Sequence, residues 1–429
     1  MRVLLIGATG MIGAHVLARL QAEGFELRAT ARSPRPPSLP SEVEWVRLDL
    51  RQATTEAAWR PLLDGVDAVV NCAGVFQDGL ADSVAAVHAQ APAALFAASE
   101  AAGVRRVIQI SAVGVDRDGL SPFSATKRTG DDALMASALE WVVLRPSVVL
   151  GRSAYGGGAL MRALAALPVA FVPPDGGLLQ VVQLDELVET IVFFLAPGAP
   201  VRVALEIAGP KQLSFAEVVA AYRRWLGWKP ARSIAAPRAF MALGYRLGDA
   251  VSLLGWRSPI RTTARLELTR GAVGDPSEWT RLTGIQPRAL ETALAATPAT
   301  VQERWFAGLY LLKALVFAVL PIFWIGTGVI SLGPGFGHGV ELMREGGAGP
   351  LSGPSVIAGA LADIAIGLGI AFRRTSRPAL YAALGLSIFY MVAGAAILPR
   401  LWADPLGPMW KIWPIMALHL VALAMRSDR

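Results

Sequence analysis

Three glycines near the start of the chain have the spacing of a turn that binds the pyrophosphate of a dinucleotide. Gly7, Gly10 and Gly13 follow an apolar run of strand length and open an amphipathic helix. Gly7 permits the tight turn, Gly10 lets the backbone approach the pyrophosphate, and Gly13 lets the helix pack against the strand. The N–H groups and the positive dipole end of that helix then face the phosphates. The other residues of this turn that we expect at the cofactor are Thr9, Met11 and Ile12.

A basic residue stands where an NAD-binding protein usually has an acidic one. The second predicted strand, residues 26–32, ends at Arg32, and Arg35 follows closely. Asp or Glu at this point accepts hydrogen bonds from the ribose 2′-OH of NAD, whereas a guanidinium suits the 2′-phosphate of NADP. The sequence therefore favours NADP(H) as the cofactor. The alternative is a solvated arginine in the Pro-rich loop 33–40.

The elements that position these residues alternate between strands and helices. The third predicted strand, residues 43–48, is followed by Asp49 and Leu50, which we expect at the edge of the adenine. The fourth, residues 66–70, is followed by small residues that let the backbone pass beneath the cofactor, among them Cys72, Ala73 and Gly74. This order predicts an α/β Rossmann-type domain with a doubly wound parallel sheet.

The composition separates an N-terminal part from a membrane part. The chain of 429 residues is too long for one ordinary domain, and 54% of its residues are hydrophobic, with nearly all long apolar runs after Trp305. The net charge of +7 comes from scattered arginines without a basic run, so we expect no nucleic-acid partner. The only cysteine, Cys72, leaves no disulfide framework and no Cys-based metal site, and we expect no metal. Met1 leads directly into the first strand, so we expect no signal peptide and a cytosolic N-terminal domain.

Over roughly residues 1–230 the chain resembles the short-chain dehydrogenase/reductase superfamily, in its extended or atypical branch. The glycine turn, Asp49-Leu50 and Asn71-x-Ala73-Gly74 occur in the expected order. The resemblance implies that Ser111 is the catalytic serine and that Lys127 binds the nicotinamide ribose. It also implies that Pro146, within 144–147, and the segment 183–186 lie near the nicotinamide and the substrate. The tyrosine of the family's Tyr-x-x-x-Lys motif is replaced by Phe123.

Phe123 limits the function that the resemblance implies, because phenylalanine has no exchangeable proton and cannot be a general acid or base. Ser111 and Lys127 can still hold substrate and ribose, and Tyr155 is a possible substitute donor. Two hypotheses follow: an NADPH-dependent oxidoreductase acting on an apolar substrate, and a non-catalytic NADPH-binding membrane module. The second resembles the nucleotide-carrying accessory subunit of respiratory complex I and would serve as an assembly factor or redox sensor. A nucleotide-sugar epimerase or dehydratase is less favoured, since that chemistry also uses the tyrosine.

The sequence divides into three regions. Residues 1–230 form the dinucleotide-binding domain with a small substrate-side α/β extension, in which Ser214 and Glu217 form a capping box. Residues 231–302 form a helical connector. Within it, the apolar segment 240–256 is either a core helix over the cleft or a helix at a membrane surface.

Residues 303–429 are predicted to form a four-helix transmembrane bundle. Four apolar segments, 308–332, 355–372, 378–398 and 412–425, follow one another, and the last is short enough to need Trp410 and its neighbours to cross a membrane. With the N-terminus inside, most flanking charges are cytoplasmic, namely Arg304, Arg373, Arg374, Arg377, Arg426 and Arg429. The outer side has only Arg344, Arg400 and Lys411. We therefore expect a multi-pass bacterial inner-membrane protein with both termini in the cytoplasm.

This half resembles the DoxX-like membrane domain, which in some bacterial proteins is fused behind such a dehydrogenase-like domain. Matching stretches include 302–307, 311–313, 324–328 and 361–363. The resemblance implies a membrane quinone or another lipid-soluble carbonyl as substrate, contact with membrane lipid, and a possible protein partner in a membrane complex. The spans contain a predicted polar cluster of Lys313, Asp363 and His419, in which Asp363 pairs with Lys313 or His419. The alternative is that Lys313 reaches the headgroups alone and Asp363 is buried in protonated form.

Overall fold

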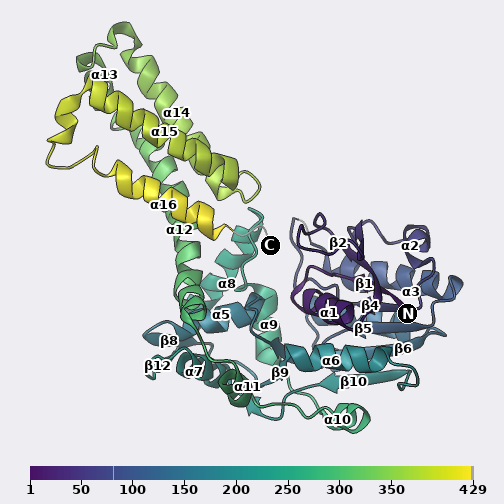
Figure 1. Cartoon of the computed structure of the whole chain (residues 1–429). Helices are drawn as coiled ribbons and strands as arrows, with labels where there is room; N and C mark the ends of the chain where they lie inside the picture. The colour runs from purple at the N-terminus through teal and green to yellow at the C-terminus, as the bar shows by residue number, and fades with distance from the viewer. Residues whose placement is uncertain (81, 427–429) are drawn as a thin grey trace. The chain divides into compact units, whose positions relative to one another are not determined.

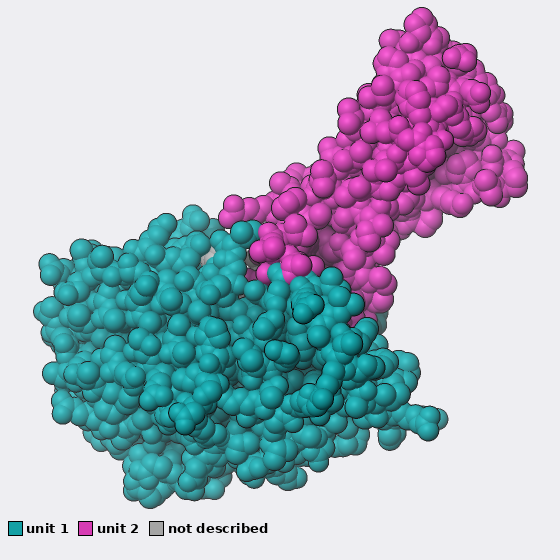
Figure 2. Space-filling model, turned by 180° about the vertical axis from the view of Figure 1, so that it is seen from behind, with its two compact units in different colours: residues 1–249, 258–307 teal, residues 250–257, 308–429 magenta. Residues whose placement is uncertain are grey.

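The computed structural model describes residues 1–80 and 82–426 of the chain, in two compact units. The first unit comprises Met1–Asp249 and Ser258–Ala307, and the second comprises Ala250–Arg257 and the residues from Gly308 onward (Figure 2). Arg429, one of the predicted cytoplasmic charges, lies outside the described residues.

The first unit is built on a seven-stranded sheet in the order β10-β6-β5-β4-β1-β2-β3, with every neighbouring pair parallel (Figure 1). The strands are β1 (Arg2–Ile6), β2 (Glu26–Ala31), β3 (Glu44–Arg47), β4 (Ala68–Asn71), β5 (Arg106–Ile110), β6 (Glu140–Pro146) and β10 (Val203–Ile207). The strand order reverses between β1 and β4, and ligands of such sheets bind beyond the carboxyl ends of the strands at this point. The predicted doubly wound parallel sheet is confirmed.

Helices cover both faces of this sheet, because successive residues of each strand point to opposite sides. In β1, Leu5 packs into the core beneath one set of helices and Leu4 into the core beneath the other. The first set is α1 (Met11–Ala22), α6 (Leu184–Leu195) and α10 (Ser277–Thr283). The second set is α2 (Glu56–Leu63), α3 (Ala91–Ala101), which follows the π-helical turn η1 (Ala86–Gln90), and α4 (Pro122–Met135). Burial of both faces explains why the strands are almost continuously apolar.

The substrate-side extension contains two small sheets and three helices, and two of these elements, at 232–235 and 290–296, lie beyond residue 230, its predicted end. One sheet joins β7 (Val148–Leu150), β9 (Leu179–Gln183) and β11 (Gln212–Leu213), and the other pairs β8 (Val169–Val172) with β12 (Arg232–Ala235). The helices are α5 (Gly156–Ala165), α7 (Phe215–Trp225) and α11 (Leu290–Ala296). The predicted capping box is confirmed, since Ser214 Oγ accepts from Glu217 N at 3.2 Å and the Glu217 carboxylate accepts from Ser214 N at 2.7 Å.

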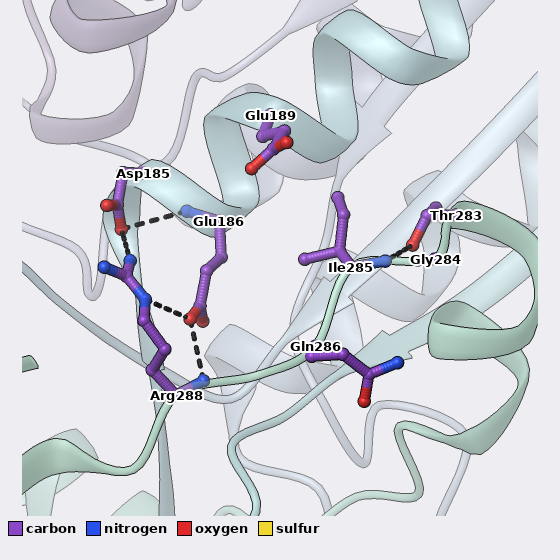
Figure 3. A pocket seen from close by; sticks show the side chains of 8 residues that line it. All are labelled: Asp185, Glu186, Glu189, Thr283, Gly284, Ile285, Gln286 and Arg288. Atoms are coloured by element: carbon purple, nitrogen blue, oxygen red, sulfur yellow. Dashed lines mark hydrogen bonds and ion pairs between the residues drawn. The ribbon is translucent and has the colours of Figure 1, made fainter. Parts of the chain in front are cut away.

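Residues 231–302, predicted as a connector, contain β12, α8 (Arg238–Ser252), α9 (Thr262–Arg270), α10 and α11, and all but 250–257 belong to the first unit. Figure 3 shows how the segment after α10 is held: Arg288 Nε donates to Glu186 Oε1 at 2.9 Å, and the guanidinium also binds Asp185. Asp185 and Glu186 therefore hold Arg288 against the start of α6. They belong to the segment that the family resemblance placed near the substrate.

The second unit is helical. Its helices are α12 (Val301–Leu332), which begins in the first unit, α13 (Phe336–Glu345), α14 (Ser352–Ala371), α15 (Ser376–Ile397) and α16 (Ile412–Met425). The short 3₁₀ turns η2 (Gly349–Leu351) and η3 (Pro399–Trp402) precede α14 and follow α15. Leu320 and Trp324 of α12 pack with Ile370 of α14, Leu380 of α15 and Ala422 of α16, so the four longest helices share one core.

Three helices of the described residues are long and apolar enough to cross a membrane: Val301–Leu332, Gly349–Ala371 and Ser376–Ile397. The fourth predicted span is not confirmed, because α16 has only 14 residues and Trp410 lies in a turn before it. A helix of that length rises about 21 Å, less than the roughly 30 Å of a bilayer core.

Candidate functional site

The turn between β1 and α1 is too tight for any residue but glycine at its key positions. Gly7 has a φ of +78°, and a Cβ there would meet the Ala73 backbone at 2.9 Å, while a Cβ on Gly13 would lie 2.2 Å from the Gly7 carbonyl oxygen. The α1 N-terminus has no side-chain cap and no acidic residue in its first turn. Its N–H groups are thus available to an anion, which fits the pyrophosphate of a dinucleotide.

The other predicted cofactor residues lie along the same edge of the sheet. Cys72 follows β4 directly, with its N–H bonded to the Ile6 carbonyl at 3.0 Å, and burial raises the pKa of its thiol to about 12. Asp49 binds Arg51 at 2.6 Å, which lowers the pKa of that carboxyl. Leu50 is buried. Thr9 and Ile12 belong to the glycine turn and the start of α1, and Pro146 is the last residue of β6.

Arg32 follows β2 directly and forms an ion pair with Asp82, with Nη1 and Oδ1 2.7 Å apart. Its side chain is 38% exposed, so the guanidinium can be reached by a ligand. A 2′-phosphate would have to share Arg32 with this carboxylate or displace it. No local pattern in the sequence indicates this competition, because Arg32 and Asp82 are far apart in the chain.

Lys127 lies in α4 with its ammonium buried at the end of β5. Its Nζ donates to the Ile110 carbonyl at 2.8 Å and lies 5.7 Å from the centre of the Phe123 ring. A Cβ on Gly74 would lie 3.8 Å from the same Nζ, so the segment after β4 passes beside the lysine. Burial lowers the pKa of Lys127 to about 8, an effect that the nearby Asp131 charge partly opposes. The structure therefore brings Lys127, Phe123 and Gly74 together.

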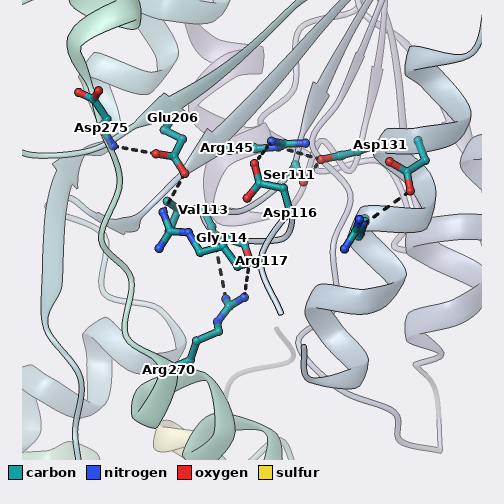
Figure 4. A network of polar contacts seen from close by, with 12 residues as sticks. Ser111, Val113, Gly114, Asp116, Arg117, Asp131, Arg145, Glu206, Arg270 and Asp275 are labelled. Atoms are coloured by element: carbon teal, nitrogen blue, oxygen red, sulfur yellow. Dashed lines mark hydrogen bonds and ion pairs between the residues drawn. The ribbon is translucent and has the colours of Figure 1, made fainter. Parts of the chain in front are cut away.

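Ser111 belongs to a buried polar network that the sequence analysis missed (Figure 4). Its hydroxyl donates to Asp131 Oδ2 at 2.7 Å, and Arg145 Nε donates to the same oxygen at 3.2 Å. Arg145 also binds the half-exposed Asp116 at 2.6 Å. Burial raises the pKa of Asp131, whereas its bonds with Ser111 and Arg145 act in the opposite direction. Asp131 lies one helical turn after Lys127, and this spacing was the available signal.

His88 is a second residue that sequence reasoning missed. Its Nε2 accepts from the Val75 N–H at 3.1 Å, and its Nδ1 lies 3.0 Å from Thr126 Oγ1. Burial lowers the pKa of His88 to about 2, so the ring is neutral. Because Nε2 accepts and Nδ1 donates, both ring nitrogens of His88 are hydrogen-bonded. His88 thereby orders the loop after β4 around the edge of Phe123, with the two ring centres 5.4 Å apart.

Tyr155, the possible substitute donor, precedes α5 and is 55% exposed. It lines a small hollow together with Met11 of the glycine turn, Arg162 and Tyr222. The structure thus places Tyr155 beside the start of α1, on the pyrophosphate side of the predicted cofactor site.

The polar residues of the second unit fall into separate groups. Asp363 accepts from the Tyr390 hydroxyl at 2.9 Å and from Thr327 Oγ1 at 3.3 Å. The predicted pairing with Lys313 or His419 is therefore replaced by bonds to two hydroxyl groups. His419 Nε2 instead accepts from Trp324 Nε1 at 2.9 Å, and Lys313 lies within electrostatic range of Arg373 and Arg426. Trp324 and Thr327 lie on one face of α12, and the Thr327 hydroxyl also bonds to the Trp324 carbonyl at 3.0 Å. These two residues therefore link His419 to Asp363.

Comparison with known proteins agrees with this division. Residues 7–162 match the NAD(P)H-binding family, and residues 321–420 match the DoxX-like family. The chain thus joins an NAD(P)H-binding domain to a DoxX-like domain.

The relatives include two named reductases. Ceramide reductase of Caulobacter vibrioides is 26% identical over 258 residues, 59% of this chain and 78% of the relative. The NAD(P)H azoreductase of Xenophilus azovorans is 26% identical over 265 residues, 59% of this chain and 85% of the relative. Uncharacterised proteins of Mycobacterium bovis and Mycobacterium tuberculosis are 28% identical over 228 residues, so the match spans 23% of their length and 52% of this chain.

Among solved structures, the chain is similar to MoeE5 in complex with UDP-glucuronic acid and NAD. The TM-score is 0.53 at 20% identity, over 69% of this chain and 97% of MoeE5. This likeness establishes the fold of the first unit.

We expect the two carboxylates bound to Arg145 to differ sharply in their contribution to stability. Asp131→Ala leaves the buried Ser111 hydroxyl without its acceptor and the buried Arg145 guanidinium with only the half-exposed Asp116, and should cost about 3–5 kcal/mol of unfolding free energy. The matched variant Asp116→Ala removes a half-exposed carboxylate and should cost less than about 1 kcal/mol. Thermal unfolding of the detergent-solubilised chain measures both, and equal losses would contradict the expectation.

We expect Arg32 to favour NADPH and Asp82 to weaken that preference. Arg32→Asp should remove about 1.5–3 kcal/mol of charge-assisted hydrogen bonding to the 2′-phosphate, roughly tenfold to a hundredfold in Kd. Asp82→Asn should instead tighten NADPH binding, because it removes the carboxylate that competes for Arg32. Fluorescence titration with NADPH and NADH measures both effects, with NADH as the control. Equal affinity of the unmodified protein for the two cofactors would refute this cofactor choice.

We expect the Asp363 site to tolerate an amide but not an alkyl group. In Asp363→Asn the carbonyl oxygen can accept from Tyr390 and the NH₂ can donate to Thr327, so folding should be retained. Asp363→Leu removes the acceptor of the Tyr390 hydroxyl and leaves Thr327 only the Trp324 carbonyl, and it should cost about 1–3 kcal/mol. Thermal stability in detergent micelles measures the difference. If the asparagine variant is as unstable as the leucine variant, the site requires the negative charge instead.

Proposed function

We propose that this protein is a membrane-anchored, NADPH-dependent oxidoreductase that reduces a carbonyl group, including that of a quinone, on an apolar substrate. The observation that carries the proposal is Lys127. Its buried ammonium lies at the carboxyl end of β5, beside the segment that follows β4. Strand β4 is the sheet neighbour of β1, which leads into the glycine turn. A buried cation with a lowered pKa next to a nucleotide site is typical of a catalytic group rather than a structural one.

The cofactor would be held by the glycine turn and by Lys127. The α1 N-terminus would bind the pyrophosphate, Arg32 would bind the 2′-phosphate, and Lys127 would donate to a ribose hydroxyl. When bound, the reduced nicotinamide supplies a hydride for the carbonyl carbon of the substrate. The carbonyl oxygen must then receive a proton so that an alcohol forms and NADP⁺ remains.

Lys127 is the group that we propose to deliver this proton. The phenol that would do so in the family is absent, and both nitrogens of His88 are already bonded. One N–H of the Lys127 ammonium is used by Ile110, which leaves two for the ribose and the substrate oxygen. Because the Ser111 proton is directed at Asp131, Ser111 would act as an acceptor that orients the alcohol form of the substrate.

The apolar character of the substrate is supported by the ring that replaces the tyrosine. Phe123 packs against Phe76 with ring centres 5.0 Å apart, and Phe76 is 42% exposed. The two rings form an apolar surface beside Lys127, where a long-chain or aromatic carbonyl compound would fit. A relative named ceramide reductase and another named azoreductase make a lipid-like or aromatic substrate a consistent choice.

We further propose that the first unit lies in the cytoplasm of a bacterium. NADPH is a cytosolic reductant, and Arg373, Arg374, Arg377 and Arg426 would then flank the spans on the inner side. A protein partner in the membrane would couple to the second unit.

A second candidate function is NADPH binding without turnover, as in an assembly factor or redox sensor. Phe123 favours it, because the ordinary proton donor is missing. Purified full-length protein loaded with NADPH separates the two hypotheses. Oxidation of the bound NADPH on addition of quinones or long-chain ketones, monitored by loss of nicotinamide fluorescence, is expected for the enzyme. Stable NADPH in the presence of all these compounds and of membrane extract would favour the binding module.

We expect activity to decrease as the pH rises through about 8, because the Lys127 ammonium loses its proton there. The group is charged below this pKa and neutral above it, so kcat should decrease about tenfold per pH unit on the alkaline side. In Lys127→Arg the charge persists at all accessible pH values, and the alkaline decrease should vanish together with most of the rate. Phe123→Tyr should give no large gain if Lys127 is the donor. A large gain, or an alkaline decrease that persists in Lys127→Arg, would assign the proton to another group.

A further inference from the structure

Helix α8 (Arg238–Ser252) carries an apolar face that no part of the first unit covers. Phe240, Leu243, Leu247 and Val251 are 62%, 55%, 55% and 39% exposed, and their spacing of three and four residues puts them on one side of the helix. Leu253, just beyond the helix, is 70% exposed. An apolar stripe of this length is unusual on a surface that faces only water.

The opposite face of α8 is fixed to the first unit. A Cβ on Gly248 would lie 1.7 Å from the Ile260 carbonyl oxygen, so helix and loop are in close contact. Tyr245 is buried, and Asp249 binds Arg261 at 2.9 Å. The apolar stripe is therefore a separate face from the one that packs against the first unit.

The chain that leaves α8 enters the membrane-spanning unit within one turn. Residues Ala250–Arg257 belong to the second unit. The Leu254 carbonyl accepts from Arg373 N at 3.0 Å, and Trp256 Nε1 donates to the carbonyl of Ala371, the last residue of α14. The Trp256 ring also lies 4.6 Å from Phe317 of α12. These contacts attach the end of α8 to the end of a span.

We propose that α8 lies in the plane of the membrane surface, with Phe240, Leu243, Leu247 and Val251 in the acyl-chain boundary. The membrane is the one apolar phase that the chain itself places within a few residues of this face. The exposed Arg246 flanks the apolar stripe, and a cationic flank on an apolar helix is typical of interfacial helices that meet anionic headgroups. The proposal concerns the placement of α8 and does not depend on whether the enzyme turns over.

The same helix also holds the loop that leads to the candidate site. Arg261, which binds Asp249 of α8, donates to the Asp78 carbonyl at 2.9 Å, and Phe76 lies two residues before Asp78. An α8 helix in the membrane surface therefore holds the segment that carries Phe76 close to the lipid, where an apolar substrate would enter. This last consequence rests on the proposed function, whereas the placement of the helix does not.

The test uses the full chain in nanodiscs of phosphatidylcholine and phosphatidylglycerol, with nitroxide labels on single introduced cysteines. Leu243→Cys and Leu247→Cys report the apolar face, and Arg246→Cys is the matched control on the polar side of the same helix. All three positions are exposed, so the label should not disturb packing. The native Cys72 should react slowly near neutral pH, because its pKa is raised to about 12, and the unmodified chain measures this background.

The collision rates of each nitroxide label with oxygen, which concentrates in lipid, and with a water-soluble nickel chelate are measured. Together they distinguish a label in lipid, in water or inside protein. We expect labels at 243 and 247 to collide with oxygen and to be shielded from nickel, and the label at 246 to show the reverse. Nickel access at 247 equal to that at 246 would mean a water-exposed face and would overturn the proposal. Shielding from both reagents would mean a protein occupant, such as a second copy, and would overturn it as well. If the labels at 243 and 247 contact lipid but the protein does not oxidise NADPH, the placement of α8 is supported and only the proposed function is contradicted.

Discussion

Burial of the Asp131 carboxylate is the constraint from which the arrangement of the candidate site follows. A buried charge costs several kcal/mol unless it is paired and hydrogen-bonded, and here Arg145 of β6 and Ser111 at the end of β5 supply these contacts. Helix α4 can satisfy Asp131 only in the register that meets both groups. That register brings Lys127, one turn earlier, to the Ile110 carbonyl and places Phe123, one turn earlier again, beside it.

This arrangement also limits which groups of the candidate site can transfer a proton. With a phenylalanine in the tyrosine position, the remaining polar groups are assigned by their bonds: Ser111 to Asp131, and His88 to Val75 and Thr126. Burial destabilises the charge of Lys127 more than the attraction of Asp131 stabilises it. The loss of a phenol and the presence of a readily deprotonated lysine are therefore related features, and together they make Lys127 the centre of the proposed reduction.

Buried polar side chains of the second unit are paired in a similar way. In lipid, unsatisfied polar groups are costly, and the buried ones bond to one another: Asp363 with Tyr390 and Thr327, and His419 with Trp324. Lys313 instead lies within electrostatic range of Arg373 and Arg426, which lie just beyond the ends of α14 and α16. The contacts of Leu254 and Trp256 with the end of α14 extend this unit back to α8, so the helix with the exposed apolar stripe is continuous with the membrane part of the chain.

The sequence by itself determined the glycine turn, the capping box and three spans, because each depends on neighbours within a few residues. The alternation of strands and helices along the chain also indicated the doubly wound sheet. Alternation of apolar residues, a small residue in a tight turn and an apolar run of spanning length are all visible locally. Only the tertiary structure decided the partners of charged groups. Arg32 meets Asp82, and Asp363 meets Tyr390, across distances in the chain that no local pattern encodes. The true length of α16 also depended on where its preceding loop turned, since hydropathy marks apolar residues without marking where a helix begins.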